Sequence, residues 1–302
     1  MRPRRAAGLA LWAALLAAAL PAAAAPRAAA PEAGPLPSLV AEPAGSPARA
    51  WAAVPGPAPG PARSIGAHGL GCIAGAQAMP AEGPGWQMVR LSRNRYWGHP
   101  ALLASLQSLA SRARAAGLPA LWIGDLGQPR GGPLPWGHAS HQLGLDADIW
   151  FELNPKPAST PAQREQIEVP SLVRADGLDV DPRRYTPAHA LLLRLAAEDP
   201  AVDRIFVNPA IKQAVCRDHA GEPWLRRLRP WRGHDSHFHI RLRCPAGQAQ
   251  CQDQAPVPPG DGCDASLAWW FSPEARQPPP PRPPGPPPRL PAACAGVLAA
   301  PG

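Results

Sequence analysis

The chain has 302 residues, including 45 prolines and 28 glycines, and a formal net charge of +8 at pH 7. This length is enough for one compact domain with a sizeable core, and the sequence contains no internal repeat. The basic balance is modest and identifies no partner, so we expect no nucleic-acid ligand.

The first 25 residues have the features of a secretory signal peptide. Arg2, Arg4 and Arg5 precede an apolar run of alanine and leucine, and small residues follow up to Ala25. The run is too short and too rich in alanine for a good membrane span, so we expect cleavage near Ala25 and no membrane span in the mature protein. Loss of the three arginines would change the formal charge from +8 to +5 (8 − 3).

The cysteine content agrees with export to an oxidising compartment. The six cysteines are Cys72, Cys216, Cys244, Cys251, Cys263 and Cys294. An even number without C-x-x-C spacing favours three structural disulfides over a cysteine-ligated zinc, although spacing alone does not decide the pairing.

Composition divides the mature chain into three parts. Residues 26–63 are dominated by alanine, proline and glycine, which predicts a flexible leader. Residues 64–276 form the expected folded domain. The Pro-rich tail, 277–302, contains a polyproline-II tract over 277–291 that is typical of a stiff spacer or of a ligand for an aromatic groove. Cys294 suggests that this tail is tied back to the domain.

The first predicted element is a helix over residues 99–116. Its leucines recur at helical spacing, Pro100 stands near its start and Gly117 follows its end. A short buried strand is predicted next, over residues 120–126.

Residues 144–151 alternate in period two, which predicts a strand with Asp146, Asp148 and Trp150 on one face. A second helix is predicted over residues 186–199, where the threonine at its start is the N-cap and a proline occupies the first helical position.

Strands are also predicted over residues 204–208 and 237–243. Because helices and strands interleave irregularly, with long connections such as 152–185, we expect an α+β fold. The expected architecture is a small, mainly antiparallel sheet flanked by helices and by long disulfide-tied loops.

Five of the nine histidines gather in two short stretches. These stretches are GHASHQLGLDADIWF (137–151) and GHDSHFHIRLRCP (233–245). Since residues two apart on a strand point the same way, His237 and His239 are expected to project to one face. If the strand that carries Asp148 lies alongside, its carboxylate can reach the same space, with His141 arriving from the preceding loop.

Two neutral imidazoles and one carboxylate leave a fourth position on a tetrahedral zinc ion, which is the ligand count of a catalytic site. Such an ion polarises a carbonyl and acidifies water, as amide hydrolysis requires. A remaining histidine would be a base or a stabiliser of negative charge. His68, His99, His189 and His219, taken singly, are better explained as solvated or hydrogen-bonded residues.

Other catalytic patterns fail. The sequence has no H-E-x-x-H, no G-x-S-x-G and no glycine-rich phosphate loop. Its two lysines, Lys156 and Lys212, follow Leu153 and Pro209 by three residues, which excludes an S-x-x-K nucleophile.

Seven blocks, in order, resemble the penicillin-insensitive murein endopeptidases, relatives of the D-alanyl-D-alanine dipeptidases and lysostaphin-type enzymes. The blocks are GCIAGA (71–76), VRLSRNRYWGHP (89–100), GDLGQPRGGP (124–133), GHASHQLGLDADIWF (137–151), RIFVNPAIKQAVC (204–216), WLRRLRPWRGHDSHFHIRLRCP (224–245) and GDGC (260–263). The resemblance implies a periplasmic zinc peptidase that hydrolyses D-alanyl–meso-diaminopimelyl cross-links of peptidoglycan and is insensitive to penicillin, because no acyl-enzyme forms.

The resemblance also implies roles for residues. The family's H-x(6)-D motif falls on His141 and Asp148, and its H-x-H motif falls on His237 and His239. The implied zinc ligands are His141, Asp148 and His239. His237 is then the candidate catalytic base or transition-state stabiliser, with His234 as a second candidate beside it.

Further positions match the family less decisively. His138 is expected to support the ligands, to contact substrate or to bind an additional metal. Asp176 is a weaker candidate for an extra zinc, since Asp179 stands where other members can offer a histidine. The candidates for binding substrate carboxylates are Arg93, Arg95 and Arg130. The implied disulfides join Cys72 to Cys294, Cys216 to Cys263, and Cys244 to Cys251.

Two alternatives stay open. One is a D-alanyl-D-alanine carboxypeptidase or dipeptidase of the same fold, which would act on chain ends. The other is a non-catalytic peptidoglycan-binding module. The sequence leaves an oligomer possible and gives little support to a metal-dependent phosphoesterase.

Overall fold

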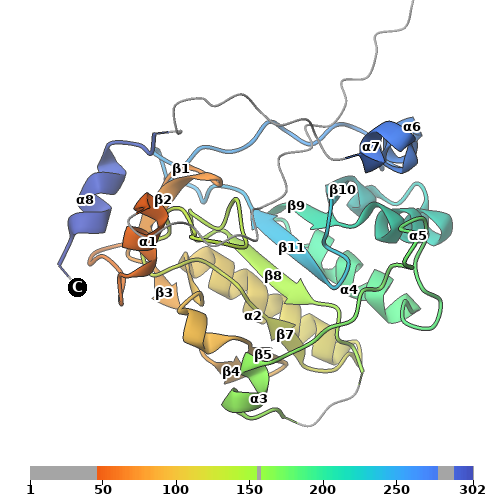
Figure 1. Cartoon of the computed structure of the whole chain (residues 1–302), viewed down its shortest axis with the longest axis horizontal. Helices are drawn as coiled ribbons and strands as arrows, with labels where there is room; N and C mark the ends of the chain where they lie inside the picture. The colour runs from red at the N-terminus through yellow and green to blue at the C-terminus, as the bar shows by residue number, and fades with distance from the viewer. Residues whose placement is uncertain (1–45, 155–157, 278–288, 302) are drawn as a thin grey trace, which may run out of the picture. The chain divides into compact units, whose positions relative to one another are not determined.

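The computed structural model describes residues 46–154, 158–277 and 289–301 (Figure 1). The predicted signal peptide, the first part of the predicted leader and most of the polyproline tract lie outside these residues.

A seven-stranded mixed sheet forms the centre of the described domain, in the order β10-β9-β11-β8-β7-β5-β4 (Figure 1). The strands are β4 (Glu82–Gly83), β5 (Trp86–Met88), β7 (Leu121–Ile123), β8 (Asp146–Trp150), β9 (Val202–Val207), β10 (Leu228–Pro230) and β11 (His237–Leu242). Four of the six neighbouring pairs are antiparallel, and β9/β10 and β5/β7 are parallel. The predicted α+β class with a mainly antiparallel sheet is confirmed.

Short strands and helices surround this sheet. The other strands are β1 (Arg63–Ala67), β2 (Leu70–Ala74), β3 (Gln77–Ala78) and β6 (Trp97–Gly98). The helices are α1 (Pro47–Ala52), α2 (Pro100–Ala115), α3 (Pro161–Glu165), α4 (Pro187–Ala197), α5 (Pro209–His219), α6 (Ala265–Ala268), α7 (Pro273–Arg276) and α8 (Ala293–Ala299). None of the helices in the described part of the chain has the length and apolarity needed to cross a membrane.

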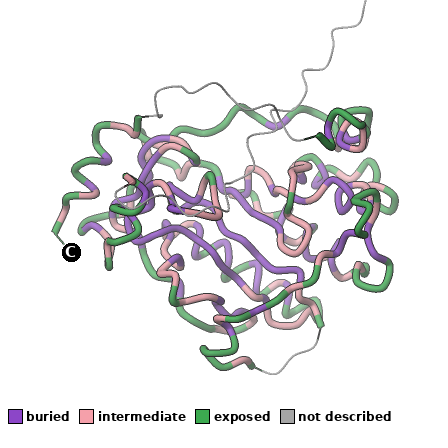
Figure 2. The backbone as a smooth tube through the Cα atoms, viewed as in Figure 1, coloured by how far each residue is buried: buried purple, intermediate pink, exposed green. Residues whose placement is uncertain are grey.

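Helix α2 covers the apolar face of the sheet, as the leucine spacing predicts, and it lies behind the sheet in Figure 1. Leu102, Leu106 and Leu109 of this helix are buried in the same core as Ile149 of β8 and Phe238 of β11. Since side chains alternate along a strand, the polar residues of β8 and β11 must point to the opposite face. The buried backbone of these strands is visible as the purple centre of Figure 2.

Three disulfides tie the long loops, and they join the pairs that the family resemblance implies: Cys72 with Cys294, Cys216 with Cys263, and Cys244 with Cys251. The first connects β2 to α8 and so links the described end of the Pro-rich tail to the domain.

Helix α1 differs from the expectation of a flexible leader. Trp51 is only 2% exposed and packs in a second, smaller core with Cys72, Cys294 and Val297. Composition missed this helix because a single tryptophan, covered by α8 and the β1-β2 hairpin, supplies the apolar surface that its alanine-rich neighbours lack.

Lys212 of α5 makes stability depend on pH. Its ammonium is fully buried and donates to the carbonyl oxygens of Leu225 (2.8 Å) and Asp261 (2.6 Å). Burial, with a smaller contribution from Arg229, lowers the pKa of Lys212 from 10.5 to about 7. The folded chain therefore holds fewer protons than the unfolded chain between these values, so the free energy of unfolding should rise from pH 7 to pH 10.5.

We expect Lys212→Met to remove this rise, which for one such lysine is on the order of 5 kcal/mol. Urea unfolding of both proteins at several pH values measures it. Arg217→Met, on the same helix but exposed, is the control. A difference between the wild type and Lys212→Met that does not vary with pH would contradict this explanation.

Candidate metal centre

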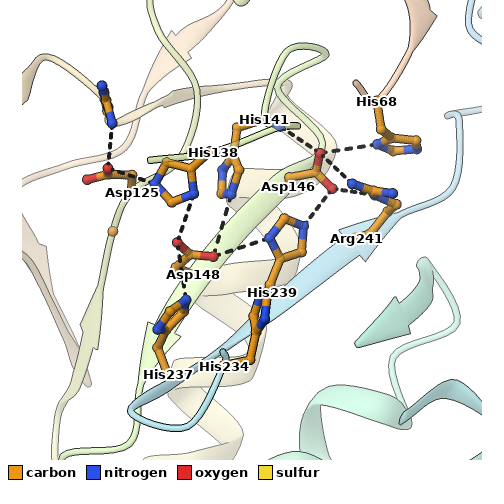
Figure 3. A network of polar contacts seen from close by, with 12 residues as sticks. His68, Asp125, His138, His141, Asp146, Asp148, His234, His237, His239 and Arg241 are labelled. Carbon is orange, nitrogen blue, oxygen red and sulfur yellow. Dashed lines mark hydrogen bonds and ion pairs between the residues drawn. The ribbon is translucent and has the colours of Figure 1, made fainter. Parts of the chain in front are cut away.

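Strands β8 and β11 bring the two histidine stretches together. They pair antiparallel, with His239 opposite Asp148 and Arg241 opposite Asp146. This register places the carboxylates of one strand and the imidazoles of the other on one face, away from α2 (Figure 3). His237, opposite Trp150, continues the row.

The loop before β8 supplies His138 and His141. His141 has a left-handed backbone conformation, with φ of 68°. Its amide N–H donates to Asp146 Oδ2 at 3.0 Å, which fixes the loop against the start of the strand. Its ring is thereby turned toward Asp148 (Figure 3).

The two carboxylate oxygens of Asp148 face different histidines. Oδ1 lies 3.5 Å from His141 Nε2 and 3.3 Å from His239 Nδ1. Oδ2 lies 3.6 Å from His138 Nδ1 and 3.8 Å from His237 Nε2. Asp148 thus lies at the centre of four imidazoles. Its interactions with them, chiefly with His141 and then with His237, outweigh the effect of burial and hold the pKa of Asp148 well below its usual range.

The buried atoms of this cluster fit a cation. Within the described residues, both ring nitrogens of His141 and Oδ1 of Asp148 are buried and make no hydrogen bond. Burial, followed by the charge of His138, lowers the pKa of His141 to about 4, so its imidazole is neutral at neutral pH, the form that binds metals. Ligand atoms of His138, His141 and Asp148 lie within 4.8 Å of one another. This donor set of imidazoles and one carboxylate suits zinc.

Asp146 supports the cluster from behind, a role that sequence reasoning did not assign. Its carboxylate accepts hydrogen bonds from His239 Nε2 (3.0 Å) and from Arg241 Nε (2.7 Å). It also lies 3.3 Å from His68 Nδ1. The contact with His239 leaves Nδ1 of that ring free to face Asp148. The D-x-D spacing on one strand face was the sequence signal for this second carboxylate.

Asp125 supports the opposite side of the cluster. This buried carboxylate lies 3.0 Å from His138 Nε2 and accepts from Arg95 Nη1 (3.0 Å) and Arg93 Nη1 (3.1 Å). Both guanidinium groups also lie over the ring of Trp136, at 4.7 Å for Arg93 and 3.9 Å for Arg95. Asp125 thereby orients Nδ1 of His138 toward Asp148. No spacing in the sequence connects Asp125 with the histidines.

Comparison with known proteins identifies the family. The family model described as penicillin-insensitive murein endopeptidase matches residues 64–299. The chain belongs to this family. Proteins named penicillin-insensitive murein endopeptidase are 48% identical to it over 224 residues in Klebsiella pneumoniae subsp. pneumoniae (74% of this chain, 81% of the relative) and 48% identical over 227 residues in Haemophilus influenzae (74% and 79%). That of Salmonella arizonae is 45% identical over 257 residues (82% and 90%).

In this member of the murein endopeptidase family, the two candidate catalytic histidines, His237 and His234, lie beside the candidate metal ligands. The His237 ring is 5.1 Å from the rings of both Trp150 and His234. Burial lowers the pKa of His237. Burial also lowers the pKa of His234, to about 3, and the neighbouring His237 is the second largest cause of that shift. Both imidazoles are therefore neutral at neutral pH.

Two predicted site residues of the murein endopeptidase chain have partners elsewhere. Arg130 is buried and donates to carbonyl oxygens at the end of α8, including Val297, Leu298 and Ala300. Because its guanidinium is used to hold the C-terminal segment, we do not retain Arg130 as a substrate ligand. Asp176 pairs with Arg174 at 3.2 Å and does not belong to the potential metal cluster found in the described residues.

Replacing Asp146 tests its support of the murein endopeptidase site. We expect Asp146→Asn to weaken zinc binding by roughly 10- to 100-fold, because an amide no longer balances Arg241 or fixes the ring of His239. Competition with a chromophoric chelator measures this affinity. The matched control is Asp203→Asn, which removes a carboxylate paired with Arg204 on β9. Equal zinc affinity for Asp146→Asn and wild type would contradict the prediction.

Proposed function

We propose that this chain is a periplasmic zinc endopeptidase that hydrolyses D-alanyl–meso-diaminopimelyl cross-links of peptidoglycan and is insensitive to penicillin. The proposal rests on one observation above all: a chain of the murein endopeptidase family gathers four histidines around a single buried carboxylate, Asp148. The predicted signal peptide and the three disulfides support a periplasmic location.

We assign the zinc ligands as His141, Asp148 and His239, with His138 beside them as a further donor. Bound zinc would polarise the scissile carbonyl and lower the pKa of water. Asp146 holds His239, and the backbone bond from His141 to Asp146 holds the loop. The protein thus fixes both histidines before substrate arrives.

His237 is the proposed proton carrier. Its Nε2 faces Asp148 Oδ2, and its neutral imidazole can accept a proton from the attacking water. The resulting imidazolium, held beside the carboxylate of Asp148, can return the proton to the amine that leaves. His234 packs against this ring and limits its movement. No side chain becomes acylated, so a β-lactam has no nucleophile to trap.

Purified dimeric muropeptides and uncross-linked pentapeptides test this function. We expect the zinc-loaded protein to convert dimers to monomers, to lose this activity with EDTA and to keep it with penicillin. Release of D-alanine from pentapeptide without cleavage of dimers would instead indicate a carboxypeptidase. Binding to sacculi without turnover of either substrate would indicate a non-catalytic module.

A further inference from the structure

Four arginines surround the histidine cluster, and one of them has no acidic partner in the part of the chain that the structure describes. The four are Arg90, Arg93, Arg95 and Arg241. Asp125 forms ion pairs with Arg93 and Arg95, and Asp146 forms an ion pair with Arg241. Among residues 46–154, 158–277 and 289–301, no carboxylate oxygen lies within 4.0 Å of a nitrogen of Arg90.

Arg90 is nevertheless held in one place. Its amide N–H donates to the carbonyl oxygen of Arg164 at 3.0 Å, and its Nη2 donates to that of Ile167 at 3.2 Å. Its guanidinium carbon lies 4.4 Å from the ring centroid of Trp150. These contacts come from the backbone and an aromatic face, so they position the cation without neutralising it.

Trp150 connects Arg90 to the reaction centre. It follows Asp148 by two residues on β8, on the same face, and its ring centroid is 5.1 Å from that of His237. The guanidinium therefore borders the side of the site where His237 lies. Arg90 is partly exposed, so a ligand can approach it.

Electrostatics at this position favours an anion. Burial lowers the pKa of Arg90 and the neighbouring Arg93 lowers it further, while the more distant carboxylates of Asp125, Asp148 and Glu165 act in the opposite direction. An arginine keeps its charge despite such a shift. A carboxylate from the substrate would relieve the repulsion from Arg93 and provide the close acidic partner that the described residues do not supply.

We propose that Arg90 binds the free carboxylate on the amine side of the scissile amide. This inference rests on the proposed function. In a cross-link through the second amino group of diaminopimelate, the carbon that carries the scissile nitrogen also carries a free carboxylate. The scissile nitrogen and this free carboxylate are attached to the same carbon. Binding of the carboxylate to Arg90 would therefore place the scissile nitrogen on the side of the site that contains His237, where the leaving amine needs a proton.

Two cross-linked peptides that differ only at this carboxylate, free in one and a carboxamide in the other, test the proposal. Calorimetry would measure their binding to zinc-loaded His237→Ala protein, in which turnover does not interfere. We expect the carboxylate to bind about 10- to 100-fold more tightly, in keeping with a charge-assisted hydrogen bond. Adding Arg90→Gln should abolish this preference, and Arg90→Lys should keep part of it.

The control is Arg183→Gln in the same background, since the side chain of Arg183 is 86% exposed and pairs with Asp181. It should keep the full preference. Equal affinity for the two peptides in the Arg90-containing protein, or an undiminished preference after Arg90→Gln, would overturn the assignment. A preference that depends on Arg90, together with no dimer cleavage by the wild type, would support the carboxylate site and reject the proposed endopeptidase function.

Discussion

His141→Asn is expected to lose bound zinc and to reduce kcat/KM on dimeric muropeptides by about 1000-fold or more, because a metal ion supplies several kcal/mol of transition-state stabilisation. His141 is the most enclosed of the proposed ligands, with no solvent exposure and both ring nitrogens without hydrogen bonds. Asparagine suits this position because it tolerates the left-handed backbone of His141 better than alanine does. The fold should therefore survive the substitution.

Elemental analysis of dialysed protein and chromatography of muropeptides measure the two effects together. His219→Ala is the control, because His219 is the last residue of α5 and its ring packs against Trp224 instead of against the clustered histidines. We expect it to keep zinc and activity. A folded His141→Asn protein with wild-type zinc content and turnover would show that the ligand set is wrong.

The strand pattern made the centre of this site predictable. Period-two alternation placed Asp148 with Asp146, and His237 with His239, on single faces of two strands, and the antiparallel pairing of β8 and β11 then puts His239 opposite Asp148. The sequence did not show that β8 and β11 are neighbours in the sheet, and only the structure established this pairing. A different local rule, the helical spacing of its leucines, located the buried face of α2.

The supporting residues follow from contacts that sequence spacing does not encode. Asp125 comes from the end of β7, and His68 from the turn between β1 and β2, and both meet the cluster only after the chain has folded. Arg130 illustrates the converse. Its position in a block shared with the family suggested substrate binding, yet its donors are satisfied by the carbonyls of α8. A shared motif therefore does not distinguish a residue that binds substrate from a residue that stabilises the fold.

His237→Ala is expected to separate proton transfer from metal binding. Because we do not assign His237 as a zinc ligand, the variant should retain zinc while kcat falls by roughly 100- to 10,000-fold, the usual contribution of a general acid or base. The lost group would be the imidazole that faces Asp148 Oδ2 at 3.8 Å. Steady-state cleavage of dimers and elemental analysis of the same preparation measure both quantities.

Comparing the zinc content of His237→Ala with that of His141→Asn distinguishes loss of proton transfer from loss of the metal. Both variants should be inactive, but only His141→Asn should lose the metal, because His141 faces Oδ1 of Asp148 with His239 whereas His237 faces Oδ2. Zinc loss in His237→Ala would place His237 among the ligands and leave proton transfer to His138 or His234. Unchanged turnover with zinc retained would remove His237 from the mechanism. The two variants together therefore test whether the histidine that faces Oδ1 binds the metal while the histidine that faces Oδ2 transfers the proton.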